Sequence, residues 1–205
     1  EQITRNSNGL RKLPLSTSPE VFNNSIKAWF LEFSNHDLAL VKNAFAMTAL
    51  TLKPTEAKKW NRVEAELPNF AQEPSGLSIA PGFPFEHTHR HHAHLMSIYP
   101  LKVLNYAKVR DRMLMEKSLD QLEKVGTREW TGYSFAWAAC LQAQAKRGDQ
   151  AVDLLKKFAS NFCSTNSFHV NGDQKGGQYS NFTYAPFTLE GNFAFAQGIH
   201  ELLLQ

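Results

Sequence analysis

Apolar residues recur at helical spacing in the first third of this chain. A cap at Ser34 or Asn35 begins a helix that is expected to end near Leu52. Its apolar face is predicted to carry Leu38, Val41, Phe45 and Thr48 or Ala49. Pro54 or Thr55 then begins a second helix that ends before Pro68, because proline cannot continue a helix. The two stretches together predict a helical hairpin.

The second half of the chain repeats this pairing. Residues 131–146 are apolar on nearly every side, which is typical of a buried helix, and residues 150–162 form an amphipathic partner. An earlier helix is expected over residues 111–125, with Gly126 as its stop and with Leu114, Leu119 and Leu122 as its apolar positions. After Pro186 the chain turns helical again, and the expected apolar positions are Phe193, Ala196, Ile199, Leu202 and Leu203.

Long polar stretches separate these helices at residues 1–24, 68–88 and 163–186, and a short helix is expected over residues 91–99. No stretch of any length alternates polar and apolar residues, so the predicted class is all-α, with helices in pairs. Polar residues gather just before the apolar helices: Glu20, His87 to His94, Trp130 to Tyr133, and Glu190 with Asn192. An inner ring of apolar helices within an outer amphipathic ring would bring these helix starts to one mouth, as in an α/α toroid.

Composition narrows the function classes. The 205 residues are 42% hydrophobic and carry a net charge of +3, with no basic run longer than a pair, so a nucleic-acid partner is not expected. No apolar run of about 18 residues suggests a membrane span. Cys140 and Cys163 are expected to be buried thiols, with one disulfide as the alternative. Residues 1–205 read as a single all-α region that we expect to be a piece of a longer chain.

The segment from His87 to Pro100 has the highest density of side chains that could bind a ligand. Five histidines and Arg90 fall within the eight residues up to His94, which indicates a polar clamp for a hydroxylated or anionic ligand. A hydrogen-bonded core histidine is the first alternative. A metal site at His87, His91 and His94 is the second, although Arg90 would repel a cation. We therefore expect no metal and no cofactor.

Two carboxylates stand out by context. Glu20 lies in a proline-stiffened loop, and Glu190 stands at the start of an apolar helix, where the helix dipole favours a negative charge. The simpler alternatives are an ordinary loop acid for Glu20 and a first-turn acid for Glu190. A general acid and a general base are the functional interpretation.

Several motifs occur in one order along nearly the whole chain. They are T-S-P-E (Thr17 to Glu20), H-R-H-x-A-H-L (His89 to Leu95), I-Y-P (Ile98 to Pro100), T-G-Y-S-F-A-W (Thr131 to Trp137), R-G-D (Arg147 to Asp149), T-L-E-G-N-F (Thr188 to Phe193) and the final H-E-L-L-L-Q. In this set the chain resembles glycoside hydrolase family 95, the inverting α-L-fucosidases and their α-L-galactosidase relatives.

The resemblance implies an (α/α) six-hairpin barrel of which this chain is the C-terminal half, with further domains of the same chain as partners. It also implies that Glu20 is the general acid and that Arg90 and His91 contact the sugar. Glu190 stands where the family has its basic aspartate, and the upstream segment with two asparagines that orients the water is absent here. A periplasmic or secreted protein of bacterial polysaccharide degradation is implied as well.

The residues suit this chemistry. An inverting glycosidase needs two carboxyl groups roughly 6.5–9.5 Å apart, so that a water fits beside the sugar. We expect His89 and Asn192 to add substrate contacts, and Trp130 or Tyr133 to stack on a sugar face. The predicted function is hydrolysis of a terminal α-L-fucosyl or α-L-galactosyl residue from an oligosaccharide or polysaccharide. Alternatives are another sugar specificity, a non-catalytic carbohydrate-binding module, and a metal-dependent enzyme.

Overall fold

The computed structural model describes residues 4–204, and the ends of the predicted 1–205 region, residues 1–3 and 205, lie outside the described residues. The chain divides into two compact units, one formed by Glu1–Phe85 with Ala93–Asn105 and the other by Glu86–His92 with Tyr106–Gln205. Within residues 4–204 the structure has six α-helices and four strands of only two residues each. The predicted all-α class is therefore confirmed.

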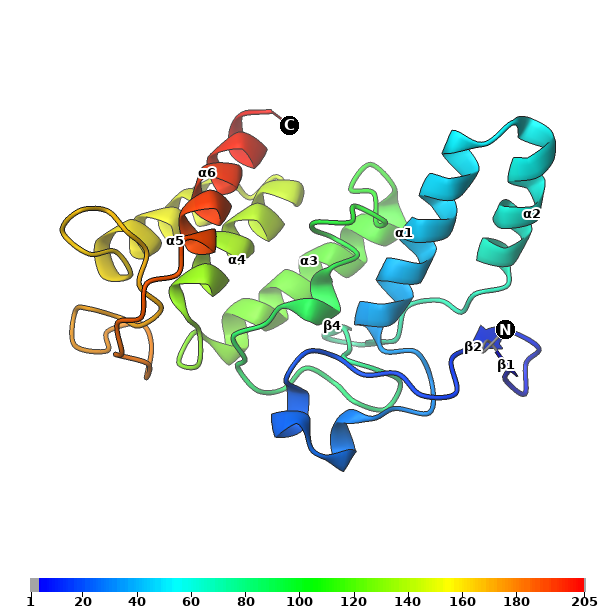
Figure 1. Cartoon of the computed structure of the whole chain (residues 1–205), viewed down its shortest axis with the longest axis horizontal. Helices are drawn as coiled ribbons and strands as arrows, with labels where there is room; N and C mark the ends of the chain where they lie inside the picture. Colours follow the sequence, from blue (N-terminus) through cyan, green and yellow to red (C-terminus); the bar gives the residue numbers. More distant parts are fainter. Residues whose placement is uncertain (1–3, 205) are drawn as a thin grey trace. The chain divides into compact units, whose positions relative to one another are not determined.

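The first unit is built on the predicted hairpin of α1 (Asn35–Thr51) and α2 (Pro54–Ala65), which run antiparallel (Figure 1). Ser34 caps α1, because its Oγ accepts a hydrogen bond from the Asp37 amide at 3.1 Å. Pro54 is the first residue of α2, where its fixed φ suits a helix and its missing N–H is not needed. Local signals thus place both helix starts.

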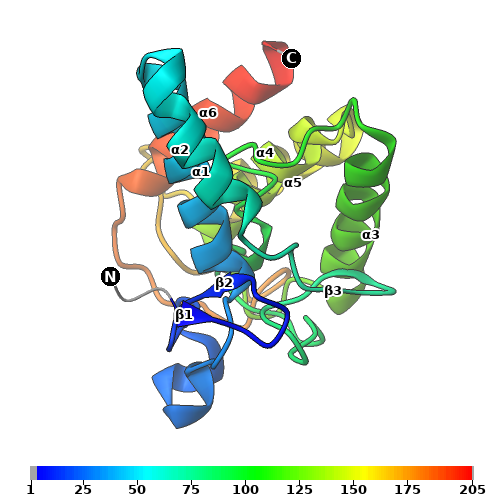
Figure 2. The same ribbon diagram turned by 90° about the vertical axis from the view of Figure 1, so that its right-hand side faces the viewer.

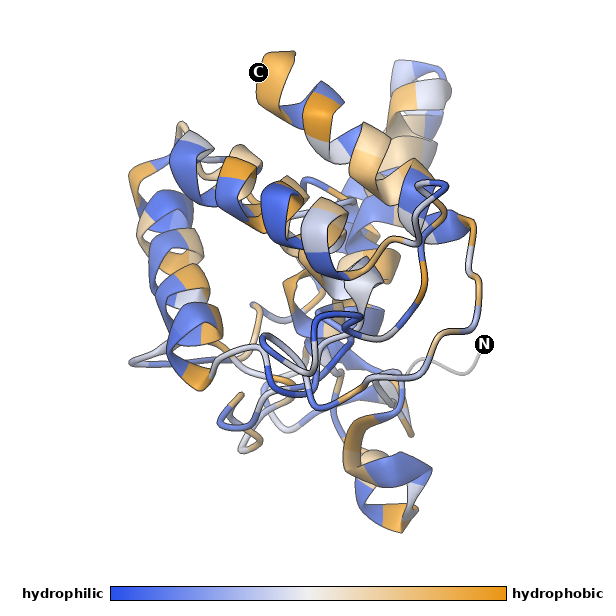
Figure 3. Cartoon of the chain, turned by 90° about the vertical axis from the view of Figure 1, so that its left-hand side faces the viewer, coloured by the Kyte–Doolittle hydropathy of each residue, from blue (hydrophilic) through white to orange (hydrophobic). Residues whose placement is uncertain are grey.

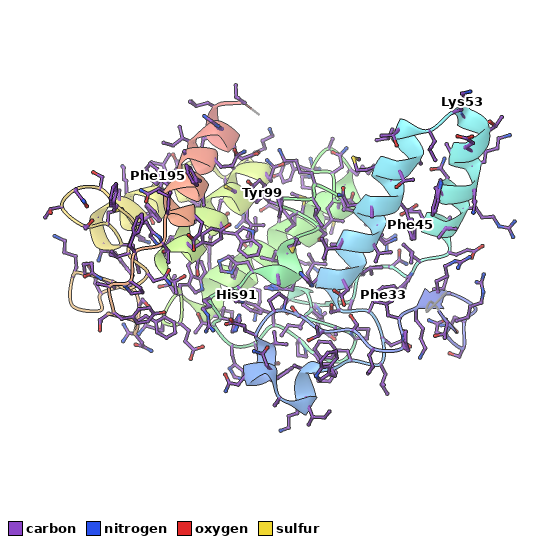
Figure 4. All side chains as sticks on the ribbon, viewed as in Figure 1. Phe33, Phe45, Lys53, His91, Tyr99 and Phe195 are labelled. Atoms are coloured by element: carbon purple, nitrogen blue, oxygen red, sulfur yellow. The ribbon has the colours of Figure 1, made fainter. Side chains whose placement is uncertain are left out.

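Apolar residues from α1 and the flanking loops form the core of this unit. Phe45 of α1 stacks on Trp60 of α2 with ring centroids 5.6 Å apart, and Figure 4 shows Phe45 on the side of α1 that faces α2. The buried members of the core are Phe33, Leu38 and Leu67, packed against Leu13, Val41, Phe45 and Phe70. Of the positions predicted for the apolar face of α1, Leu38, Val41 and Phe45 therefore lie in this core.

Two small hairpins lie in stretches that were expected to be loops. Strand β1 (Thr4–Arg5) pairs antiparallel with β2 (Arg11–Lys12), as Figure 2 shows. Strand β3 (Gln72–Glu73) pairs antiparallel with β4 (Gly76–Leu77). Pairs of two residues are too short to show an alternating pattern in the sequence. They close loops rather than build a sheet.

The second unit is organised around α4 (Gly132–Gln144), which packs against α5 (Gly148–Asn161) and α6 (Glu190–Leu203), as Figure 1 shows. Ten of the thirteen residues of α4 are buried, as its apolar character on every side predicts. Small side chains let the three helices approach closely, and the shared core comprises Ala139, Ala143, Ala151 and Leu155, with Leu154, Phe195 and Leu202 against it.

Helix α3 (Val109–Val125) is tied to the turn between α4 and α5 by ion pairs. Nε of Arg147 donates to Glu116 Oε2 at 2.7 Å, and an Nη group donates to Asp120 Oδ1 at 2.6 Å. Burial alone would lower the pKa of Arg147, but its bonds to the two carboxylates raise it. The R-G-D motif thus carries a structural arginine that stays charged and joins α3 to the turn before α5.

The face of α6 that packs inward differs from the expected one. Phe193, Ile199 and Leu203 are 67%, 38% and 76% exposed, and Figure 3 shows hydrophobic colour along this helix up to the C-terminus. Of the expected positions, Leu202 packs inward, and it does so together with Gly191, Phe195 and Gly198. Glycine adds little to a hydrophobic pattern, yet it allows the closest approach of one helix to another. The predicted face was therefore wrong at Phe193, Ile199 and Leu203 and right at Leu202.

Two further expectations can be compared with the structure. Cys140 is buried and Cys163 half-buried, and both are free thiols. Across residues 4–204, no helix combines the length and apolar character that a membrane crossing needs.

Candidate active site

The site residues predicted from sequence fall in both units. Glu20 and His94 belong to the first unit. The others belong to the second, namely His87, His89, Arg90, His91, Trp130, Tyr133, Glu190 and Asn192. The predicted separation between the Glu20 and Glu190 carboxyl groups therefore stays a prediction.

Glu20 sits in a loop that is held in an unusual backbone shape. Its φ of 55° is in the left-handed region, as are the φ angles of Phe22, Asn23 and Asn24. This conformation costs a non-glycine residue roughly 1–2 kcal/mol, so packing must maintain it. Val21, between them, is buried in a cluster that includes Phe30. The half-buried Glu20 thus has a defined position in the first unit.

The polar residues before Glu20 fasten this loop to the start of α1. Ser16 Oγ donates to Asp37 Oδ2 at 2.7 Å, and Ser34 Oγ donates to the Thr17 carbonyl at 2.5 Å. Burial would raise the pKa of Asp37, but hydrogen bonds from His36, Ser16 and the Thr17 amide lower it overall. The carboxylate therefore stays ionised as an acceptor, and it holds the T-S-P-E segment in place.

The histidine-rich segment is not the helix that was expected over residues 91–99. Only Ala93–Leu95 forms a single 3-10 turn, and His94 is buried there, with its ring stacked on Phe85 at 4.1 Å. His94 is thus a core residue of the first unit rather than part of a clamp. In residues 4–204 no three His, Cys, Asp or Glu side chains form a group that could hold a metal ion.

The part of this segment before Ala93 is anchored to the first turn of α4. Ser134 Oγ accepts from the Thr131 amide at 3.1 Å and donates to the Arg90 carbonyl at 2.7 Å. The ring of His92 donates from Nε2 to the Ser134 carbonyl at 3.1 Å, and it packs edge-on against Trp130. Ser134 therefore holds the backbone of the H-R-H motif at Arg90 and the ring of His92 directly after the motif.

Around this anchor, the rings of His89 and His91 meet edge to face at 5.3 Å, and both side chains are half-buried. The His89 pKa is lowered, first by burial and only partly restored by the His91 carbonyl and Glu129. A neutral imidazole has one donor and one acceptor. Nδ1 of His89 accepts from the His91 amide at 3.1 Å, so its Nε2 is the nitrogen left to donate to a sugar hydroxyl group.

His92 itself is fully buried, and burial lowers its pKa to about 3. The unfolded chain binds a proton at this residue below about pH 6.5, whereas the folded chain stays neutral. We therefore expect the unfolding free energy to fall as the pH drops from 6.5 toward 3, by about 1.4 kcal/mol per pH unit from this residue. Urea denaturation at several pH values would show a flatter slope for His92→Gln, which keeps a donor but does not titrate. Equal slopes would contradict this origin.

The two aromatic candidates at the start of α4 have different surroundings. Trp130 is 3% exposed, with its ring against His92 and Phe135, so it is a packing residue and not a stacking platform. Tyr133 is 37% exposed. Of the two expected stacking residues, only Tyr133 presents ring surface.

The starts of α4 and α6 come together in this unit. Burial raises the pKa of Tyr133, and electrostatic interactions with Cys140 and Glu190 add to this rise. The hydroxyl of Tyr133 therefore lies within electrostatic reach of the Glu190 carboxylate. Glu190 itself is exposed in the first turn of α6, where its charge is favoured.

Asn192, in contrast, is occupied by the preceding loop. Its Oδ1 accepts from the His169 amide at 2.9 Å, and its Nδ2 donates to the Ser167 carbonyl at 2.9 Å. Both ends of the amide are thus used to hold residues 167–169 on the first turn of α6. This arrangement favours a structural role for Asn192 over the expected substrate contact.

The polar loop before α6 is organised by Asp173, which sequence reasoning did not single out. Its carboxylate accepts from the amides of Lys175 at 2.8 Å and Tyr179 at 2.7 Å, and from the Asn161 side chain at 3.1 Å. Burial would raise its pKa, but these bonds lower it. Ser180, at the far end of the loop, donates to the Trp130 carbonyl at 2.6 Å and so supports the start of α4.

Comparisons with known proteins agree with the motifs. The model of the glycosyl hydrolase family 95 catalytic domain matches residues 3–203. Alpha-L-fucosidase 2 of Arabidopsis thaliana is 29% identical over 119 residues, which are 57% of this chain and 13% of that protein. The chain therefore spans a small part of the length of this curated relative. Because the family match extends over nearly all of its residues, the chain belongs to glycosyl hydrolase family 95.

Proposed function

We propose that the protein containing this chain is an inverting glycoside hydrolase that removes a terminal α-L-fucosyl or related α-L-galactosyl residue from an oligosaccharide or polysaccharide. The observation that carries the proposal is the family match over residues 3–203, and the relative named alpha-L-fucosidase 2 supports the sugar class. The exposed position of Glu190 in the first turn of α6 adds a structural reason, because a base must reach a water next to the sugar.

In this mechanism Glu20 donates a proton to the glycosidic oxygen as the leaving group departs. Glu190 accepts a proton from a water that attacks the anomeric carbon on the opposite face, so the configuration inverts. The position of Glu190 in the exposed first turn of α6 suits this role, since a base must reach the attacking water. Its side chain is one methylene longer than the family's aspartate, which shortens the expected gap to the Glu20 carboxyl group.

The sugar is held by the segment that Ser134 anchors. Arg90, His91 and His89 supply hydrogen bonds to hydroxyl groups, and Tyr133 stacks on the sugar face. Arg90 also argues against a catalytic cation at this segment, because two positive charges repel. The proposed reaction needs neither a metal nor another cofactor.

We further propose that residues 1–205 form the C-terminal half of an (α/α) six-hairpin barrel. The α1–α2 hairpin and the pairing of buried α4 with amphipathic α5 are the kind of units from which such a barrel is built. The remaining wall, and the asparagines that orient the water in the family, would come from other parts of the same protein. The 205-residue chain alone is therefore expected to have little activity.

The test uses the full-length protein and a panel of aryl glycosides that includes α-L-fucoside and α-L-galactoside. Hydrolysis of one of these two, followed by NMR, should release the β-anomer first and should continue in the presence of EDTA. Initial release of the α-anomer would indicate a covalent, retaining mechanism. Binding without turnover would instead support the alternative of a carbohydrate-binding module, which the glutamate at the base position favours.

A further inference from the structure

The ring of His169 fills a slot between the starts of α4 and α6. A Cβ atom built on Gly191 would lie 2.2 Å from Nδ1 of His169, and one built on Gly132 would lie 2.2 Å from Nε2. Both helices therefore need glycine at these positions because the imidazole occupies the space of a side chain. The ring is completely buried and lies parallel to Phe158 of α5, with centroids 5.0 Å apart.

Hydrogen bonds join the same residue to both sides of Glu190. Nδ1 of His169 lies 2.8 Å from the Thr188 carbonyl oxygen and 2.7 Å from the Thr188 hydroxyl oxygen. In the tautomer that the carbonyl requires, Nδ1 carries the proton and donates it to Thr188. The backbone amide of His169 donates to Asn192 Oδ1 at 2.9 Å. Thr188 is two residues before Glu190, and Asn192 is two residues after it, so His169 holds the turn that presents the carboxylate.

The ring stays neutral in this slot. Burial lowers the pKa of His169, and the Thr188 carbonyl and the charge of Glu190 offset only part of this decrease. A neutral ring with one fixed donor works as a spacer and a hydrogen-bond donor. Its complete burial distinguishes His169 from the half-buried histidines of the H-R-H motif.

We propose that His169 is a positioning residue that fixes the first turn of α6 and so directs the Glu190 carboxylate toward the bound sugar. The inference rests on the proposed function, in which Glu190 is the base. Because a displacement of about 1 Å can lower a rate roughly 100-fold, a residue that orients both helix starts should affect the rate without touching substrate. Loss of its donor should therefore lower kcat rather than raise KM.

Two substitutions separate positioning from packing. His169→Phe keeps a flat ring on Phe158 but removes the donor to Thr188, whereas His169→Asn keeps an amide donor near the place of Nδ1 but removes the ring. On the aryl glycoside that the full-length protein cleaves, we expect the Phe variant to lose roughly 10- to 100-fold in kcat, with KM within about twofold. The Asn variant should retain more kcat than the Phe variant even if its melting temperature is lower.

The opposite order would overturn the proposal. If packing alone matters, the Phe variant keeps wild-type kcat and the Asn variant loses activity in step with its melting temperature. His200→Phe, on the exposed side near the other end of α6, is the matched control and should keep wild-type kcat. An inactive Glu190→Gln with a fully active Phe variant would reject only the role of His169. Full turnover by Glu190→Gln would reject the proposed function and this inference together.

Discussion

Glu190→Gln is expected to abolish turnover while leaving substrate binding nearly unchanged. The amide keeps the size of the side chain but cannot take a proton from water, and a base contributes little to binding of the ground state. Loss of a general base typically costs on the order of 10²–10⁴ in rate. Kinetics on the aryl glycoside, together with calorimetric titration of the free sugar, would measure the two effects separately in the full-length protein.

A matched control is available in the first unit. Glu56 is likewise an exposed glutamate in the first turn of a helix, α2, and Glu56→Gln should leave kcat unchanged. Glu20→Gln provides the contrast, because loss of the acid should impair substrates with poor leaving groups far more than activated aryl glycosides. Equal losses on both kinds of substrate would contradict the assignment of Glu20, and weakened sugar binding by Glu190→Gln would contradict that of Glu190.

Gly191→Ala is expected to destabilise the second unit strongly. Its Cβ would lie 2.2–2.6 Å from three atoms of the His169 ring, which is far inside van der Waals contact. The ring is enclosed by Phe158 and Gly132, so it has little room to move. Overpacking of this kind costs about 1–3 kcal/mol or more. The melting temperature should fall by several degrees, as measured by circular dichroism.

Gly148→Ala supplies the comparison. Gly148 is also a glycine in the first turn of a helix, α5, but a Cβ atom there would meet nothing within 4 Å. This change should be neutral or slightly stabilising, since alanine favours the helix. The double variant Gly191→Ala with His169→Ala should recover part of the lost stability relative to the sum of the two single changes. Strict additivity would show that the ring and the glycine do not compete for one space.

Much of the helical framework follows from local signals. The cap at Ser34, the proline that begins α2 and the glycine that follows α3 each satisfy or interrupt backbone hydrogen bonding, so the sequence alone located these boundaries closely. The burial of α4 could also be predicted from the sequence, because a helix that is apolar on all sides has no face suited to water. The motifs also identified the family, which the comparison over residues 3–203 bears out.

The helix expected over residues 91–99 illustrates a limit of local reasoning. His92 and His94 lie two positions apart in the histidine-rich segment. His92 nevertheless packs on Trp130 in the second unit, and His94 packs on Phe85 in the first. The chain passes between two cores within these few residues, and it forms only a 3-10 turn. Contacts with distant residues, rather than spacing along the chain, decide which histidines are buried.

By itself the sequence determined the helical class, most helix boundaries, the family and the residue types of the proposed chemistry, because these depend on short-range spacing and on motif order. The tertiary structure alone decided which face of α6 is buried, why Trp130 and Asn192 are engaged in packing and hydrogen bonding, and that His169 lies between Gly132 and Gly191. The reason is that glycine and a single buried histidine leave little hydrophobic signal, while close packing makes their exact fit decisive.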